Sequence, residues 1–307
     1  MTLTAEPRSW TQRHLLDVKG LHRDEIERLL DLAVVMRDAR AARTNRSLLE
    51  ADTVGLAFFE ASTRTRVSFE LAAKALGATV VDLQVGSSSV AKGESLIDTA
   101  RTLERTGVTI LVLRHPTSGA PEMVARGTGL RVVYGGDGTH AHPTQALADA
   151  LTLREHLGGL DGRLVTIVGD VVHSRVARSN IHCLQALGAR VRIAGPAAWI
   201  EGFETTTGLE IATGLAAGLR DADAVMALRA QLERGAILPP ELASWRLDTE
   251  RMGLARPGAP ILHPGPTNEG VELTAELASG PRSLIGQQVS NGVPVRMAVL
   301  AWLAGSS

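Results

Sequence analysis

The 307-residue chain has one cysteine, few aromatic side chains, almost no net charge and no long apolar run. A single cysteine, Cys183, excludes an intramolecular disulfide and a cysteine-based metal cluster. With 32 basic and 33 acidic residues the formal charge is −1, so no global field attracts nucleic acid or an anionic membrane surface. No apolar run approaches the roughly 20 residues of a membrane span, and the first residues lack a signal-peptide core. We therefore expect a cytoplasmic protein without nucleic-acid or membrane partners, in which any anion is bound locally.

Small aliphatic residues supply most of the hydrophobic content, which is 44% of the sequence against 3% aromatic. This composition is typical of α/β proteins in which helices pack closely on parallel sheets. The length suits about two domains of ~150 residues. We expect two doubly wound parallel-sheet domains, one over residues 1–150 completed by a C-terminal helix at 290–307, the other over residues 151–289. Periodic apolar positions also predict a first helix over residues 14–40 and a last one over 293–303.

The most informative stretch is Ser-Thr-Arg-Thr-Arg at residues 62–66. It follows the apolar run 54–59, which predicts a buried strand, and precedes apolar positions at helical spacing up to Leu76. A turn from strand to helix presents backbone N–H groups and the positive end of the helix dipole at the carboxyl edge of a sheet. Hydroxyls and guanidiniums in that turn predict a phosphate site. The alternative is an ordinary helix cap with two solvated arginines.

Other polar side chains of the first half also follow predicted strands or lie in adjoining loops. Lys92 lies in a Ser- and Gly-rich loop that either closes over an anion or is simply solvated. Arg114 ends a predicted strand, where open α/β sheets bind ligands. His142 and Gln145 are three residues apart at the start of a predicted helix, so both can face one ligand. A metal site would need a third ligand beside His140 and His142, and none stands at ligand spacing.

The second half repeats the alternation of strand and helix from residue 164 onward. Only Gly169 stands where a dinucleotide fingerprint needs three glycines, which weakens an NAD interpretation. Instead, the segment 173–175 (His-Ser-Arg) offers donors suited to a carboxylate. Arg229 follows another predicted strand, and the His-Pro-Gly-Pro turn at 263–266 fixes a backbone that exposes carbonyls. Because these clusters track strand ends, we expect one cationic active site in the cleft between the two domains.

In order and spacing these segments resemble the catalytic chains of the aspartate carbamoyltransferases, within the aspartate/ornithine carbamoyltransferase superfamily. The resemblance runs from about Leu15 to Leu303. The motif at 62–66 marks the wider superfamily, whereas ornithine enzymes carry His-Cys-Leu-Pro where this chain has His-Pro-Gly-Pro at 263–266. Cys183 cannot substitute, because it is expected in the middle of a helix. The chain departs from the family pattern at three positions: Ala230, Thr267 and Glu269.

The resemblance implies transfer of the carbamoyl group of carbamoyl phosphate to the amine of L-aspartate, giving N-carbamoyl-L-aspartate and phosphate in pyrimidine biosynthesis. Positioning and electrostatic stabilisation would suffice, without a metal, a cofactor or a covalent intermediate. The implied catalytic residues are Arg64, Thr65, Lys92, Arg114 and His142. The implied carbamoyl phosphate ligands are Ser62, Thr63, Arg64, Thr65, Ser88, Arg114, His142, Gln145, Gly265 and Pro266. The implied L-aspartate ligands are Lys92, Arg175, Arg229 and Gln231.

The resemblance further implies a homotrimer in which the loop of Ser88 and Lys92 reaches the neighbouring subunit's site. Regulatory chains or other pyrimidine-pathway enzymes are further candidate partners. Two other functions stay open. One is a carbamoyltransferase for another amino acid such as ornithine, and the other is a catalytically idle homologue that only binds partners. The presence of Lys92, Arg114 and His142 argues against the idle homologue.

Overall fold

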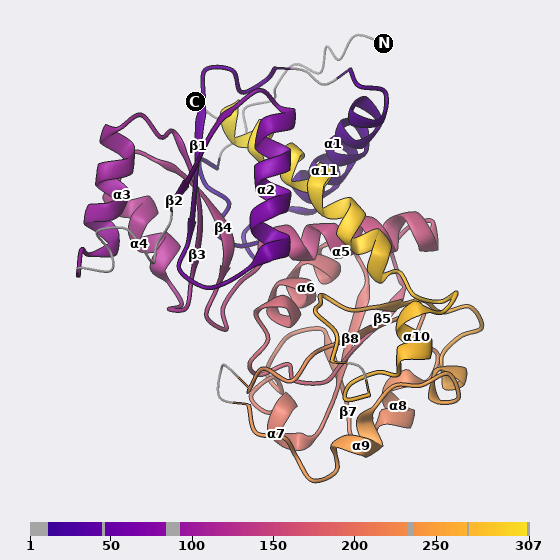
Figure 1. Cartoon of the computed structure of the whole chain (residues 1–307). Helices are drawn as coiled ribbons and strands as arrows, with labels where there is room; N and C mark the ends of the chain where they lie inside the picture. Colours follow the sequence, from indigo (N-terminus) through magenta and orange to yellow (C-terminus); the bar gives the residue numbers. More distant parts are fainter. Residues whose placement is uncertain (1–11, 45–46, 84–92, 233–235, 269, 306–307) are drawn as a thin grey trace. The chain divides into compact units, whose positions relative to one another are not determined.

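The computed structural model describes residues 12–44, 47–83, 93–232, 236–268 and 270–305. By internal contacts the chain divides into two compact units. The first comprises Met1–Asp17, Arg28–Asp137 and Gly292–Ser307, and the second comprises Val18–Glu27 and Gly138–Asn291. Each unit is built on one parallel sheet flanked by helices (Figure 1). The expectation of two α/β parallel-sheet domains is therefore confirmed, while the predicted boundary at residue 150 stays a prediction.

The sheet of the first unit has the order β2-β1-β3-β4, and its neighbouring strands are parallel. The strands are β1 (Thr53–Phe58), β2 (Thr79–Leu83), β3 (Ile110–His115) and β4 (Arg131–Asp137). Strands β1, β3 and β4 are buried along most of their length, as expected for strands covered on both faces, whereas the edge strand β2 has no buried residue. Phe58 lies opposite Arg114 in the pairing of β1 with β3.

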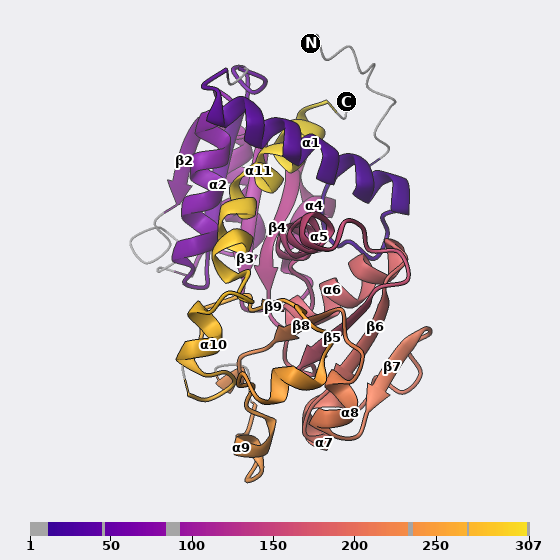
Figure 2. The same cartoon turned by 90° about the vertical axis from the view of Figure 1, so that its right-hand side faces the viewer.

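Helices cover both faces of this sheet (Figures 1 and 2). On one face lie α1 (Arg23–Ala41), α2 (Thr63–Ala75) and the last helix, α11 (Ile285–Ala304). On the other lie α3 (Leu96–Arg105) and α4 (Ala120–Gly127), whose Ala100 and Val124 join Leu111, Leu113 and Val132 in one apolar cluster. Helix α2 begins after Ser62, whose hydroxyl accepts from the backbone N–H of Thr65.

The sheet of the second unit has the order β7-β6-β5-β8-β9, again with parallel neighbours. Its strands are β5 (Leu164–Val168), β6 (Arg190–Ala194), β7 (Leu209–Ala212), β8 (Ala224–Ala227) and β9 (Ile261–Leu262). Two longer helices, α5 (Pro143–Leu157) and α6 (Arg175–Ala186), pack against each other, and α6 also packs against β6.

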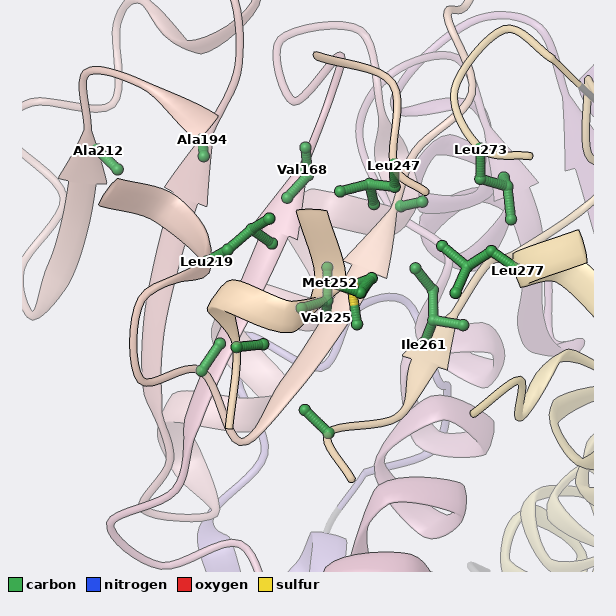
Figure 3. Packing of buried hydrophobic residues seen from close by; sticks show 14 residues of the cluster. Val168, Ala194, Ala212, Leu219, Val225, Leu247, Met252, Ile261, Leu273 and Leu277 are labelled. Carbon is green, nitrogen blue, oxygen red and sulfur yellow. The ribbon is translucent and has the colours of Figure 1, made fainter. Parts of the chain in front are cut away.

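The second unit also has short helices: α7 (Ala197–Ile200), α8 (Leu215–Leu219), α9 (Leu242–Trp245), the 3-10 helix η4 (Arg251–Leu254) and α10 (Ala275–Ser279). Of these, α8, η4 and α10 contribute buried residues to one face of the sheet. Figure 3 shows the apolar cluster beneath them, in which Val225 and Ile261 of the sheet lie with Leu219, Met252 and Leu277. Small residues such as Ala194 and Ala227 in this cluster let the helices approach the strands closely, as the alanine-rich composition predicted.

Two helix predictions were wrong at their N-terminal ends. Leu15 lies outside α1 and forms a parallel bridge with Val133, so its apolar side chain is buried at a sheet edge. Helix α11 begins at Ile285, well before residue 293, and runs through Gly292 and Pro294. Gly292 lies inside this helix, where a Cβ added to it would lie 2.6 Å from Nη1 of Arg296.

Three further findings complete the fold. Cys183 is buried in α6 as a free thiol, as expected, and burial raises the pKa of that thiol.

Among the helices of the described ranges, none combines the length and apolarity needed to cross a membrane. Helix α4 and strand β7 were not predicted, because both are short and carry no apolar run long enough to separate them from loops.

Candidate functional site

The first unit has a topological switch point between β1 and β3. In the sheet, β1 lies between β2 and β3. The chain leaves β1 toward β2 on one side and leaves β3 toward β4 on the other, so the two connections run in opposite directions. Open α/β sheets bind ligands in the crevice at the carboxyl ends of such strands. The predicted motif at 62–66 follows β1, and Arg114 lies at the end of β3. The backbone N–H of Phe59 donates to the carbonyl of Arg114 at 2.8 Å, which fixes the two strand ends together.

The motif at 62–66 forms the N-terminal turn of α2. Ser62 is the N-cap, with a hydroxyl 3.3 Å from the N–H of Thr65, so the capping alternative is right for this side chain. Thr63 and Arg64 are exposed at the first turn, which contains no acidic residue to compensate the helix dipole. Arg66 instead pairs with Asp82 on β2. The turn therefore offers an anion one exposed hydroxyl and one exposed guanidinium.

Arg114 is buried, and its guanidinium Nη2 lies 2.5 Å from a carboxylate oxygen of Glu60. The ring of the neighbouring His115 lies 5.1 Å from that of Phe59 at an interplanar angle of 53°, and its Nδ1 accepts from the N–H of Thr117. Burial lowers the pKa of His115, which favours the neutral ring. Glu60 was not singled out from the sequence, although it stands two residues before the cap.

In the second unit, His142 and Gln145 begin helix α5. His142 is the N-cap residue and 5% exposed, and its backbone N–H donates to the hydroxyl of Ser179 at 2.9 Å. The N–H of Gln145 donates to the carbonyl of His142. The side-chain amide of Gln145 donates to Asp149, one turn further along the helix, at 2.7 Å. The two predicted site residues are thus held in adjacent positions by the first turn of one helix.

The second unit has its own switch point, between β5 and β8. Asp170, which is fully buried two residues after β5, joins the loops that follow these two strands. Its Oδ1 lies 2.8 Å from Nδ1 of His173, and its Oδ2 accepts from the N–H of Gln231 at 3.0 Å. The side-chain amide of Gln231 in turn donates to the carbonyl of Arg229. This carboxylate was not predicted, and its only sequence signal is an acidic residue directly after Gly169.

The predicted donor set at 173–175 takes three different roles. His173 pairs with Asp170, and Ser174 caps α6 through a hydroxyl that accepts from Ala177. Arg175, the first residue of α6, is 4% exposed, with Nη1 at 3.5 Å from the carbonyl of Gly138. Because the helix cap uses the hydroxyl oxygen of Ser174 as an acceptor, its O–H can still donate, and the carboxylate site at 173–175 stays a prediction.

The turn at 263–266 is fixed by side chains beneath it. His263 is buried, accepts at Nδ1 from the N–H of Gly265 at 2.8 Å, and lies 3.1 Å from Glu272 through Nε2. Glu272 also accepts from the N–H of Asn268 at 2.6 Å. Gly265 adopts a φ of 66° and precedes a cis peptide bond to Pro266. Gly265 and Pro266, which the resemblance implies as carbamoyl phosphate ligands, thus belong to a turn that side chains hold in place.

The structure brings the predicted residues into two sets, one per unit. The first unit holds Ser62, Thr63, Arg64, Thr65 and Arg114, and the second holds His142, Gln145, Arg175, Arg229, Gln231, Gly265 and Pro266. Ser88, Lys92 and Glu269 lie outside the described residues. Within the part of the chain that the structure describes, no group of three or more His, Cys, Asp or Glu side chains is arranged to hold a metal ion.

Comparison with known proteins gives matches over nearly the whole chain. The family profile "Aspartate/ornithine carbamoyltransferase, carbamoyl-P binding domain" matches residues 13–155, and "Aspartate/ornithine carbamoyltransferase, Asp/Orn binding domain" matches residues 161–303. An aspartate carbamoyltransferase catalytic subunit from Gluconacetobacter diazotrophicus is 52% identical over 98% of this chain and 96% of its own length.

Two solved structures share the fold. Ornithine carbamoyltransferase from Pyrococcus furiosus superposes with a TM-score of 0.87 at 28% identity, covering 97% of this chain and 99% of its own. Aspartate transcarbamoylase from Trypanosoma cruzi, in complex with carbamoyl phosphate and aspartate, superposes with a TM-score of 0.84 at 29% identity, covering 94% of each chain.

Proposed function

The chain belongs to the aspartate/ornithine carbamoyltransferase family, and on that premise we propose that it transfers the carbamoyl group of carbamoyl phosphate to the amine of L-aspartate. The relative at 52% identity carries the aspartate name. The two solved structures, an ornithine enzyme at 28% identity and an aspartate enzyme at 29%, do not separate the two acceptors. The 52% identity to an aspartate enzyme supports aspartate as the acceptor.

The observation that carries the choice of acceptor is the pair of arginines at the second switch point. Arg175 and Arg229 follow β5 and β8, which are neighbours in the sheet. L-Aspartate has two carboxylates and one amine, whereas ornithine has one carboxylate and two amines. A guanidinium matches a carboxylate through two parallel hydrogen bonds and repels an ammonium group. We assign one carboxylate of aspartate to each arginine, with Gln231 beside them.

We assign the phosphate of carbamoyl phosphate to the first switch point. The exposed Thr63 and Arg64 and the N-terminal backbone of α2 supply donors there, next to Ser62 and Thr65. Arg114 and His142 would hold the carbonyl oxygen. Its NH₂ group needs hydrogen-bond acceptors, which we assign to the amide oxygen of Gln145 and the carbonyls of Gly265 and Pro266. Ser88 and Lys92 keep the roles that the sequence resemblance implies.

The proposed reaction follows from these assignments. The amine of aspartate attacks the carbonyl carbon, negative charge develops on the carbonyl oxygen, and the bond to phosphate breaks. Donors already fixed around that oxygen stabilise the developing charge without reorganising. Holding both substrates in contact removes much of the entropic cost of bringing them together. The chain's residues would thus act by position and charge, without a covalent intermediate.

We further propose a carbamoyl phosphate domain at residues 1–150 completed by residues 290–307, and an aspartate domain at 151–289. The first family profile ends at residue 155 and the second begins at 161, which supports a boundary in this region. The homotrimer, its candidate regulatory or pathway partners and the cytoplasmic location belong to the same proposal.

The test is an assay of phosphate release from carbamoyl phosphate with L-aspartate, L-ornithine or no acceptor. We expect release that depends on aspartate, together with N-carbamoyl-L-aspartate identified by mass spectrometry. Release that depends on ornithine alone would instead assign the chain to the ornithine branch. If neither L-aspartate nor L-ornithine raises phosphate release above the background rate, the result would favour the catalytically idle homologue.

A further inference from the structure

Asp149 is a fully buried carboxylate on α5 that accepts hydrogen bonds from three side-chain amides. Oδ1 accepts from Gln145 at 2.7 Å and from Gln288 at 2.8 Å, and Oδ2 accepts from Asn180 at 2.9 Å. All of these residues belong to the second unit. Buried charges are retained in proteins when they are well bonded, because losing a partner leaves a costly uncompensated group.

A carboxylate constrains the direction of every amide that contacts it. An ionised carboxylate only accepts hydrogen bonds, whereas an amide has an NH₂ end that donates and an oxygen end that accepts. Gln145 must therefore turn its NH₂ toward Asp149 and its oxygen away. Without the carboxylate, either end of the Gln145 amide could face a ligand. Asp149 thus decides that Gln145 presents an acceptor.

A second route leads from Asp149 to the turn at 263–266. Gln288, turned by the same carboxylate, uses its oxygen to accept from the backbone N–H of His263 at 2.9 Å. The ring of His263 then accepts from the N–H of Gly265 at 2.8 Å. Asp149 is therefore connected both to Gln145 and to the turn that carries the carbonyls of Gly265 and Pro266. These are the three acceptors assigned to the NH₂ group of carbamoyl phosphate.

We propose that Asp149 is a positioning residue that makes the site selective for a carbamoyl group over other acyl phosphates. The proposal rests on the function proposed above. Acetyl phosphate has a methyl group in place of the NH₂ and therefore has no N–H to donate. A site that presents oriented acceptors favours the NH₂, because a methyl group would leave those acceptors unpaired.

The test compares the binding of carbamoyl phosphate and acetyl phosphate to the full-length wild-type protein and to Asp149→Asn. The asparagine keeps the size but offers one donor and one acceptor, so Gln145 and Gln288 are no longer forced to turn their NH₂ groups inward. We expect the Kd of carbamoyl phosphate, measured by calorimetry without an acceptor, to rise about tenfold, the value of one or two hydrogen bonds. The Kd of acetyl phosphate and that of inorganic phosphate should stay unchanged.

Two variants separate positioning from general stability. Asn180→Ala is the matched control, since it removes a bond to the same carboxylate but leads to no assigned acceptor. It should lower the melting temperature and leave the preference for carbamoyl phosphate intact. Gln145→Ala should lose the preference to a similar extent, and the double variant Gln145→Ala with Asp149→Asn should lose less than the product of the two effects.

Each outcome decides the proposal. An unchanged ratio of the two Kd values in folded Asp149→Asn would show that the carboxylate only stabilises the fold, and the proposal would be wrong. If that variant does not fold, Gln288→Met, which cuts the route to His263, takes its place, and an unchanged ratio there has the same meaning. Because these are binding measurements, they remain decisive even if aspartate proves not to be the acceptor.

Discussion

The buried Arg114 reaches the end of β3 with a carboxylate partner already in place. A guanidinium that is largely removed from water needs a counter-charge, and Glu60 provides it at 2.5 Å while its own side chain keeps 24% of its exposure. The ion pair through Nη2 fixes the guanidinium at the end of the strand. In the proposed site, the substrate oxygen would approach a guanidinium that is already held in position.

Arg114→Ala and His142→Ala should lower turnover far more than they lower stability. Each removes one donor assigned to the carbonyl oxygen, and one such donor is worth roughly 10²–10³ in rate. Steady-state kinetics beside thermal unfolding checks this. Arg66→Ala is the matched control, since Arg66 belongs to the same motif but pairs with Asp82. Normal turnover in either variant would remove that residue from the catalytic set.

Arg229→Ala should weaken aspartate binding while carbamoyl phosphate still binds. A charged clamp on a carboxylate contributes about 2–5 kcal/mol when its loss leaves the partner unpaired. Separate titrations with carbamoyl phosphate, and with the unreactive dicarboxylate succinate in the presence of phosphate, measure the two affinities. An equal loss for both ligands would show that Arg229 does not belong to the aspartate subsite.

At this scale the sequence predicted residues whose chemistry is local and missed those whose partners are distant. The helix cap at Ser62, which was the alternative to its role as a phosphate ligand, and the position of Cys183 within a helix could be expected because both depend on a few neighbours. Asp149 was not, since one of its partners, Gln288, lies 139 residues away along the chain. A carboxylate inside an apolar helical stretch is a signal that such distant donors exist.

At the scale of elements, the polar residues of both sheets lie where the strand order reverses. In the first unit β1 lies between its successor β2 and the later strand β3, and in the second unit β5 lies between its successor β6 and the later strand β8. The apolar runs were sufficient to predict most strands, because buried parallel strands are apolar throughout. Strand order was not predicted from them, since it depends on pairing between segments far apart in sequence.

The close approach of the loops after β5 and β8 depends on Gly169. This residue has a φ of +123°, and a Cβ added to it would lie 2.8 Å from the carbonyl oxygen of Leu228. Gly158, at the end of α5, also has a positive φ, +71°, but nothing lies within 4 Å of a Cβ added there. The two glycines differ in steric contact and also in backbone region, because a φ of 71° is close to the left-handed region open to other residues and a φ of 123° lies outside it.

Gly169→Ala should destabilise the protein clearly more than Gly158→Ala. The control pays only for the left-handed backbone, about 1–2 kcal/mol, whereas Gly169→Ala must also displace Leu228 or Gly169 itself. Because the loop after β8 carries Arg229, the KM for aspartate should rise as well. Thermal unfolding and kinetics of both variants provide the comparison. Equal melting temperatures would mean that the loops can shift without cost.

At the scale of the whole molecule, a formal charge of −1 coexists with arginines and helix N-termini gathered at strand ends. A net charge close to zero does not attract anions from a distance, so anion binding depends on local donors that are already in position. Binding therefore requires that the donors of each site are accurately placed by the fold. If the proposed homotrimer is right, that assembly includes a residue from another subunit, Lys92.

Mixing two inactive variants tests the shared site. Lys92→Ala and Arg64→Ala chains should each be nearly inactive alone, and activity should return after the subunits are dissociated, mixed and reassembled. In a cyclic trimer that contains both variants, about one site in three combines an intact Arg64 from one chain with an intact Lys92 from the next. Each hybrid trimer should therefore reach roughly a third of wild-type activity.

The control is the double variant carrying both substitutions in one chain, mixed with wild type. In these hybrids a site is intact only where one wild-type chain supplies Arg64 and the next chain, also wild type, supplies Lys92. The activity of the mixture should therefore not exceed that of unmixed wild type. Native mass spectrometry must first show that subunits exchange. If hybrids form and the mixture of single variants stays as inactive as either alone, Lys92 acts within its own chain or outside the site. The shared arrangement would then be wrong, because every cyclic trimer that contains both single variants has one site with an intact Arg64 and an intact Lys92 from the next chain.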